Sequence, residues 1–166
     1  MQLKQRLVLV GALLAAGCNR TVPPPPASPP SPFRPVADVK QVMASVIEPA
    51  ADKYWDAVGT IVDAKGVLEI APKTDDEWKA VRDSAFVFTE GGNLLMMSGR
   101  AKDNGDWITF AQALVEVGQR AIKAAESKNR KAVFDAGAEV YDACVHCHSK
   151  YIVPGTTPAS PKRPGA

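Results

Sequence analysis

Five consecutive residues near the end of the chain, Cys144-Val145-His146-Cys147-His148, bring together side chains that are suited to chemistry. They include two of the three cysteines and both histidines of the 166-residue chain. On a helix, Cys144 lies three positions before Cys147 and four before His148, so these three side chains project from one face. Thiols and an imidazole grouped in this way suit a redox dithiol, a metal ion or a covalently attached cofactor.

The surrounding sequence argues against the first two chemistries. A redox dithiol normally lies at a helix N-terminus in a βαβ context, whereas these cysteines come near a helix end, where the backbone dipole disfavours a thiolate. A structural zinc ion takes four ligands, usually from two separated clusters, and the sequence contains no second cluster. His146 lies inside the CxxC loop, so we expect it at the surface, pointing away from any group that His148 binds.

The third chemistry uses both thiols and the adjacent imidazole. Two thiols can add across the two vinyl groups of haem to form thioethers, and the following histidine can then ligate the iron. These attachments must reach one rigid macrocycle from a single stretch of backbone, which accounts for the close spacing. CxxCH is the attachment sequence of c-type haem, so the sequence predicts one covalently bound haem c with its iron.

Four segments with helical periodicity are available to position this motif. The first begins near Val36 and contains Pro49, which predicts a kink or break near Glu48. The second opens with a capping box at 74–77, and the third follows a short turn at 104–106. The predicted inward-facing positions are Val39, Met43, Val46, Ala50, Tyr54 and Ala57 in the first segment; Trp78, Val81, Ala85, Phe88, Gly92, Leu95 and Gly99 in the second; Trp107, Phe110, Leu114, Val117, Ala121 and Ala124 in the third; and Val133, Gly137, Val140, Cys144, Cys147 and Tyr151 in the fourth.

These segments predict an all-α fold, an antiparallel four-helix bundle with CxxCH on its last helix and a domain at 35–153. No segment alternates with period two over strand length, so β structure has little support, and residues 59–73 form the longer link between the first two helices. Eight prolines lie between positions 23 and 35 and predict an extended tether, and residues 154–166 are expected to be a disordered tail.

The start of the chain resembles a bacterial lipoprotein signal. Lys4 and Arg6 precede a short apolar stretch, and small residues lead directly to Cys18, whose thiol is acylated in such proteins. The resemblance implies a signal peptide at 1–17, a lipidated Cys18 that opens a Pro-rich tether at 18–34, and a membrane-anchored protein of the periplasm. The net charge of the whole chain is only +2, and loss of Lys4 and Arg6 would balance the charges, so the composition gives no support for nucleic-acid binding.

A helical bundle with CxxCH on its last helix, followed by Ser149-Lys150-Tyr151, resembles the cytochrome c-prime family and its low-spin relatives. The resemblance covers about residues 36–151 and implies thioether links at Cys144 and Cys147, with His148 as the fifth iron ligand. Family members often have arginines that contact the haem propionates, near the positions of Lys40 and Lys150 in this chain. The propionate contacts therefore stay open.

The sixth position of the iron would decide the function. In the low-spin branch a methionine of the first helix fills it and suits electron transfer, and Met43 is the candidate here. Met96 and Met97 are rival ligands, and each of the three methionines could equally be a core residue. In the c-prime branch the position is open at rest and suits binding of nitric oxide or carbon monoxide.

The sequence therefore predicts a monohaem c-type cytochrome that transfers single electrons to a partner protein in the periplasm. The alternative is a five-coordinate haem protein that binds or senses small gases, and a lipoprotein in which CVHCH occurs by chance is a third hypothesis. No nucleophile set, paired-carboxylate site or phosphate-binding loop is found, so an enzymatic function is not expected. The resembled family also suggests a homodimer formed through its first two helices.

Overall fold

The computed structural model describes residues 32–152. This part of the chain is mostly helical and contains one two-stranded sheet, which is compatible with the predicted all-α class. Its elements in chain order are α1 (Val39–Val42), the π-helical segment η1 (Met43–Ile47), α2 (Glu48–Asp56), β1 (Gly59–Asp63), β2 (Gly66–Ile70), α3 (Asp75–Met96), α4 (Asp106–Glu126) and α5 (Arg130–Tyr151).

Side-chain caps fix where α3 and α5 begin. The predicted capping box is confirmed at α3: the Glu77 N–H donates to Thr74 Oγ1 at 3.2 Å, and the Thr74 N–H donates to the Glu77 carboxylate at 3.0 Å. At α5 the side chain of Asn129 accepts from the Ala132 N–H at 2.9 Å. These caps satisfy backbone donors that have no partner within the helix.

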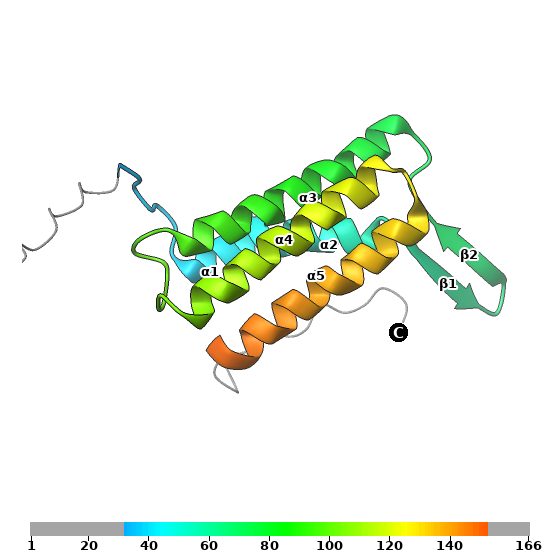
Figure 1. Ribbon diagram of the computed structural model, residues 1–166. Helices are drawn as coiled ribbons and strands as arrows, with labels where there is room; N and C mark the ends of the chain where they lie inside the picture. The colour runs from blue at the N-terminus through cyan, green and yellow to red at the C-terminus, as the bar shows by residue number, and fades with distance from the viewer. Residues whose placement is uncertain (1–31, 153–166) are drawn as a thin grey trace, which may run out of the picture. The chain divides into compact units, whose positions relative to one another are not determined.

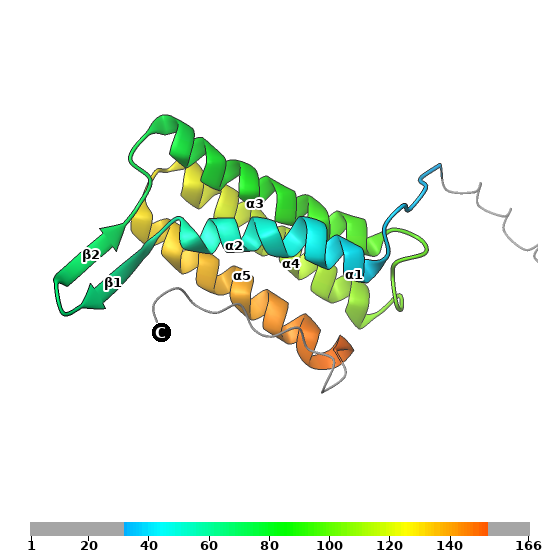
Figure 2. The same ribbon diagram turned by 180° about the vertical axis from the view of Figure 1, so that it is seen from behind.

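Successive long helices run antiparallel and side by side (Figures 1 and 2). The indole of Trp107, at the start of α4, donates to the carbonyl of Leu95, near the end of α3, at 2.8 Å. The segment α1–η1–α2 forms one further helical stretch, and Tyr54 from it donates its hydroxyl to the Ala121 carbonyl of α4 at 3.1 Å. Because α4 and α5 are also antiparallel, the end of α5 lies beside the start of α4.

The helices enclose an apolar core that matches most of the predicted inward-facing positions. Tyr54 and Phe88 are completely buried and meet edge to face, with ring centroids 5.7 Å apart. On α5, Val133, Gly137 and Val140 are buried as predicted. Gly99 is the clear exception, because α3 ends at Met96 and Gly99 lies exposed in the following loop.

The predicted disturbance near Glu48 is present, but it is a π-helical turn and the helix does not break. Pro49 has no N–H to donate to the preceding turn, and the Glu48 N–H reaches back five residues to the Met43 carbonyl. The extra residue in the turn shifts the helical register. As a result the buried positions before the proline are Val42 and Ile47, five apart, and Met43 is only partly buried.

The expectation of little β structure is wrong for the link between α2 and α3. Residues 59–70 form an antiparallel hairpin in which Ile61 pairs with Leu68 and Val62 with Val67. It projects from the end of the helices (Figure 1), and Val62, Val67 and Leu68 are largely exposed. The base of the hairpin is held by Arg130, which donates to the carbonyls of Gly59 at 2.7 Å and Ile70 at 3.2 Å.

The packing of α3 on α4 gives a first prediction. A Cβ at Gly118 of α4 would overlap the buried side chain of Thr89 on α3, so Gly118→Ala should reduce the free energy of unfolding by about 1–3 kcal/mol, as overpacked cores do. Urea unfolding measures this change. Gly59→Ala is the matched control, because its Cβ would meet only Ile70 Cδ1 at 3.9 Å. Equal losses in the two variants would contradict the close approach of these helices.

Candidate functional site

The CxxCH motif lies in the last two turns of α5, where the buried face of the helix approaches its end. Cys144 and Cys147 are partly buried, and Cys144 packs against the core; His148 is exposed. Neither thiol is in a disulfide. The structure thus brings both sulfurs and the imidazole to adjacent positions of one helical face, as their spacing predicts.

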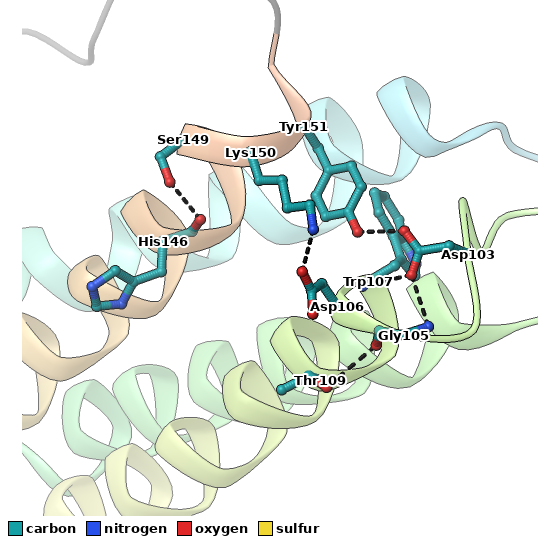
Figure 3. Close-up of polar contacts among 9 residues, drawn as sticks. All are labelled: Asp103, Gly105, Asp106, Trp107, Thr109, His146, Ser149, Lys150 and Tyr151. Atoms are coloured by element: carbon teal, nitrogen blue, oxygen red, sulfur yellow. Dashed lines mark hydrogen bonds and ion pairs between the residues drawn. The ribbon is translucent and has the colours of Figure 1, made fainter.

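Contacts just beyond the motif hold this end of α5 against the start of α4 (Figure 3). The Tyr151 ring meets the Trp107 ring edge to face at 5.0 Å, and its hydroxyl donates to the Asp103 carboxylate. Lys150 forms an ion pair with Asp106. Asp103 also accepts from the backbone N–H groups of Gly105 at 2.8 Å and Trp107 at 3.1 Å. The hydrogen bond from Tyr151, followed by these backbone bonds, lowers the pKa of Asp103.

The environment of the two thiols keeps them protonated. Burial, with a smaller contribution from Cys147, raises the pKa of Cys144 to about 11. Burial also raises the pKa of Cys147. A catalytic redox dithiol requires the opposite shift, because its nucleophilic cysteine must be a thiolate at neutral pH. The structure therefore gives no support to the redox-dithiol alternative.

Two opposing effects act on the pKa of His148. Partial desolvation of its ring lowers the pKa of His148, whereas the nearby Glu48 carboxylate acts in the opposite direction. The carboxylate of Glu48, at the start of α2, therefore lies within electrostatic range of His148. A lowered pKa favours the neutral imidazole, which is the form that ligates a metal.

His146 occupies the position expected of a surface residue. It is exposed, and Figure 3 shows its ring pointing away from the Tyr151 contacts. The Ser149 hydroxyl donates to the His146 carbonyl at 2.7 Å, a bond within the last turns of the helix.

The three candidate methionines lie in different surroundings. Met43 is the first residue of η1 and packs at the margin of the core. Met96 is also partly buried against the core. The sulfur of Met97 accepts a hydrogen bond at 3.2 Å from Arg100, a buried arginine that also donates to the Ala37 carbonyl at 2.9 Å. No hydrogen bond of the described residues joins any of these methionines to the CxxCH side chains.

Aromatic and aliphatic side chains continue from the motif along α5. Tyr141 and Val145 are exposed by 55% and 44%. The Tyr141 ring lies 6.1 Å from that of Trp55, which comes from α2 and donates its indole N–H to the Gly137 carbonyl at 2.9 Å. The partly buried thiols therefore adjoin apolar and aromatic surface as well as His148.

Other predicted features lie outside the described residues. Cys18, the signal peptide, most of the Pro-rich tether and the tail belong to this group. Within residues 32–152, no helix is long and apolar enough to cross a membrane. In the same range, no three His, Cys, Asp or Glu side chains form a group that could hold a metal ion.

Comparison with protein-family models, curated proteins and solved structures gives no match to this chain. The interpretation of the site therefore depends on its own residues. Sequence reasoning identified the motif but missed Glu48, Asp103 and the anchoring role of Tyr151. The turn residues around Asp103 were visible in the sequence, but nothing local to them indicated a partner 48 positions away.

The state of the thiols gives a second prediction. At pH 8, a pKa of about 11 leaves ~0.1% of Cys144 as thiolate, against about a quarter for a free cysteine. In the haem-free chain we expect Cys144 to react with iodoacetamide more slowly than Cys147, and its rate to keep rising up to about pH 11. Peptide mass spectrometry at a series of pH values measures both rates. The same chain in urea is the control, and equal rates for Cys144 before and after unfolding would refute this burial.

Proposed function

We propose that this protein is a monohaem c-type cytochrome that transfers single electrons in the periplasm, with the helices arranged as an antiparallel four-helix bundle around the haem. One observation supports this best: two cysteines outside any disulfide and a histidine lie on one face of α5. The pKa of Cys144 is raised, which favours the thiol, and the pKa of His148 is lowered, which favours the neutral imidazole. This donor set fits haem c, because thioether formation needs free thiols and iron ligation needs a neutral imidazole.

Some residues of the chain would attach the haem, and others would orient the residues that attach it. Cys144 and Cys147 would hold the haem by thioethers, and His148 would be the fifth iron ligand. The iron would supply the one-electron chemistry. Tyr151 and Lys150 fix the end of α5 and with it the direction in which all three donors project. The nearby carboxylate of Glu48 would influence the basicity of the imidazole.

Apolar surroundings support a role in electron transfer. Burial and the exclusion of water are among the means by which a protein sets the potential of a haem. Tyr141, Val145 and Trp55 provide apolar surface near the thiols.

Met43 is the sixth ligand in this proposal. The Glu48 N–H donates to the Met43 carbonyl, so these two residues lie one π turn apart on the helix. Glu48 acts electrostatically on His148, so Met43 would ligate the iron if its side chain extends on the side of the helix that carries Glu48. A thioether ligand raises the potential of the iron and suits rapid exchange of one electron.

The anchor and the location belong to the same proposal. A lipid on Cys18 and the Pro-rich residues that follow would hold the domain at a membrane surface, where it would meet a redox partner protein. Export fits the chemistry, because c-type haem is attached outside the cytoplasm.

Haem attachment is tested by production with and without the cytochrome c maturation machinery, followed by a haem stain of a denaturing gel. We expect a stained band only with the machinery, and its loss in the double variant Cys144→Ala/Cys147→Ala, which can form no thioether. His148→Ala should retain stain but change the visible spectrum, because the iron loses its protein ligand. His146→Ala is the matched control, and both its stain and its spectrum should match the unmodified protein. A wild-type chain without stain would refute the proposal.

Ligation by Met43 is tested separately by the ferric spectrum. We expect a low-spin spectrum with a sulfur-to-iron charge-transfer band, and conversion to high spin with rapid carbon monoxide binding in Met43→Ala. Met96→Ala should leave the spectrum unchanged, because it removes an equally flexible, partly buried methionine from another helix. An unchanged Met43→Ala spectrum would exclude this ligand. A high-spin wild-type protein would favour gas binding over electron transfer.

A further inference from the structure

The β1–β2 hairpin presents apolar side chains to solvent on both of its faces. Val62, Val67 and Leu68 are exposed by 73%, 68% and 61%. Paired residues of an antiparallel sheet point to the same side, so Val62 and Val67 lie on one face of the hairpin, and Ile61 and Leu68 lie on the other. Exposed apolar groups gathered in this way mark an interaction surface.

The hairpin is also open at its edges. It has two strands, and among the described residues neither of them pairs with a third strand. A two-stranded hairpin is marginally stable in water, and its unpaired backbone N–H and C=O groups are a template for a further strand. Arg130 ties the hairpin to α5 through Gly59, Thr60, Glu69 and Ile70. This tie lies at the base and does not extend to the half of the hairpin next to the turn.

Of the two strands, β2 is the more accessible. Its first four residues are all exposed, whereas Gly59 and Ile61 of β1 are half-buried. No proline lies within β2, and its register with β1 contains no bulge, so β2 lacks two of the features by which proteins block an edge strand. The outer edge of β2 is therefore the place where a further strand can add.

The charges around β2 favour a second copy of β2 as that strand. When two β2 strands run antiparallel about a two-fold axis at Val67, the two Val67 residues face each other. Lys65, two positions before Val67, then faces Glu69, two positions after it, on both sides of the axis. Opposite charges directly across an antiparallel pair are stabilising. A pair of β1 strands has no such register, because Asp63 is the one charged residue of β1.

Both charged side chains are accessible for this pairing. Glu69 forms a 3.4 Å ion pair with Arg130, but its side chain remains 66% exposed, so a second cation can reach the carboxylate. The side chain of Lys65 is in no ion pair within residues 32–152. The hairpin projects from the end of the helices (Figure 1), so two copies that meet in this way place their helices at opposite ends of the shared sheet.

We propose that two copies of this chain dimerise through β2 and form a four-stranded antiparallel sheet about a two-fold axis at Val67. Two Lys65–Glu69 ion pairs fix the register of this sheet, and the Val67 side chains meet between them. The hairpin is tied to the start of α5, whereas the CxxCH motif lies in its last turns. The inference therefore does not rest on the proposed function, and the interface differs from a pairing through the first two helices.

The test is sedimentation equilibrium of the full-length chain in a reducing buffer. We expect a monomer–dimer equilibrium with a dissociation constant of about 100 µM, as a small interface would give. Lys65→Glu and Glu69→Lys each replace two attractive pairs by two repulsive ones, so each variant should weaken the dimer by about tenfold or more. An equimolar mixture of the two variants brings opposite charges together again, and it should form a heterodimer about as stable as the wild-type dimer.

Charge reversals outside the hairpin are the matched controls. Lys102→Glu, in the loop before α4, and Glu90→Lys, on α3, change the net charge by the same amounts at exposed positions, and both should keep the wild-type dissociation constant. The heterodimer also controls for folding, because a variant that had lost its hairpin could not form it.

Three results would overturn the proposal: a wild-type chain that stays monomeric up to about 1 mM, a dimer that the reversals at Lys65 and Glu69 do not weaken, or a mixture of these variants that stays monomeric. A monomeric wild-type chain that co-sediments with vesicles of phosphatidylethanolamine and phosphatidylglycerol would also overturn it, because the exposed hairpin would then bind a membrane surface.

Discussion

The packing of Tyr151 against Trp107 sets the position of the last turns of α5, and the candidate site depends on that position. The motif ends three residues before Tyr151, so any rotation of this end of the helix would carry Cys144, Cys147 and His148 with it. The Tyr151–Asp103 and Lys150–Asp106 contacts are exposed, and exposed polar contacts contribute little free energy by themselves. The aromatic contact with a buried indole is thus the main constraint, and the polar pairs select its geometry.

The same partial burial gives each donor of the motif its chemical state. Desolvation penalises the charged form, so it raises the pKa of both thiols and lowers that of the imidazole. A site for thiolate chemistry would need positive charge or a helix N-terminus nearby, and the motif instead lies at a helix C-terminus, where the dipole opposes an anion. Position on the helix and burial therefore act together to keep the thiols neutral, whereas burial alone favours the neutral imidazole.

Local patterns in the sequence were sufficient to predict the long helices and most of their buried faces. The capping box at Thr74 and the small connections before α4 and α5 depend on neighbouring residues, so the sequence shows them directly. The hairpin at 59–70 was missed because both of its faces carry exposed apolar side chains, which removes the alternation that marks a half-buried strand. The Asp103–Tyr151 and Arg130–Gly59 contacts could not be predicted from the sequence either, because they join residues that only the packed helices bring together.

The π turn shows how a constraint on the backbone changes the burial of a candidate ligand. In an uninterrupted α-helix, Met43 would fall on the buried stripe that leads to Ala50 and Tyr54, and it would be a core residue. Pro49 removes a donor, the turn widens to a five-residue repeat, and Val42 takes the buried position instead. The Met43 carbonyl then accepts from the Glu48 N–H, and the Glu48 carboxylate acts electrostatically on His148. The proline that disturbs the helix thus also changes which side chains are buried, because Met43 is left only partly buried at the margin of the core, where a regular helix would bury it.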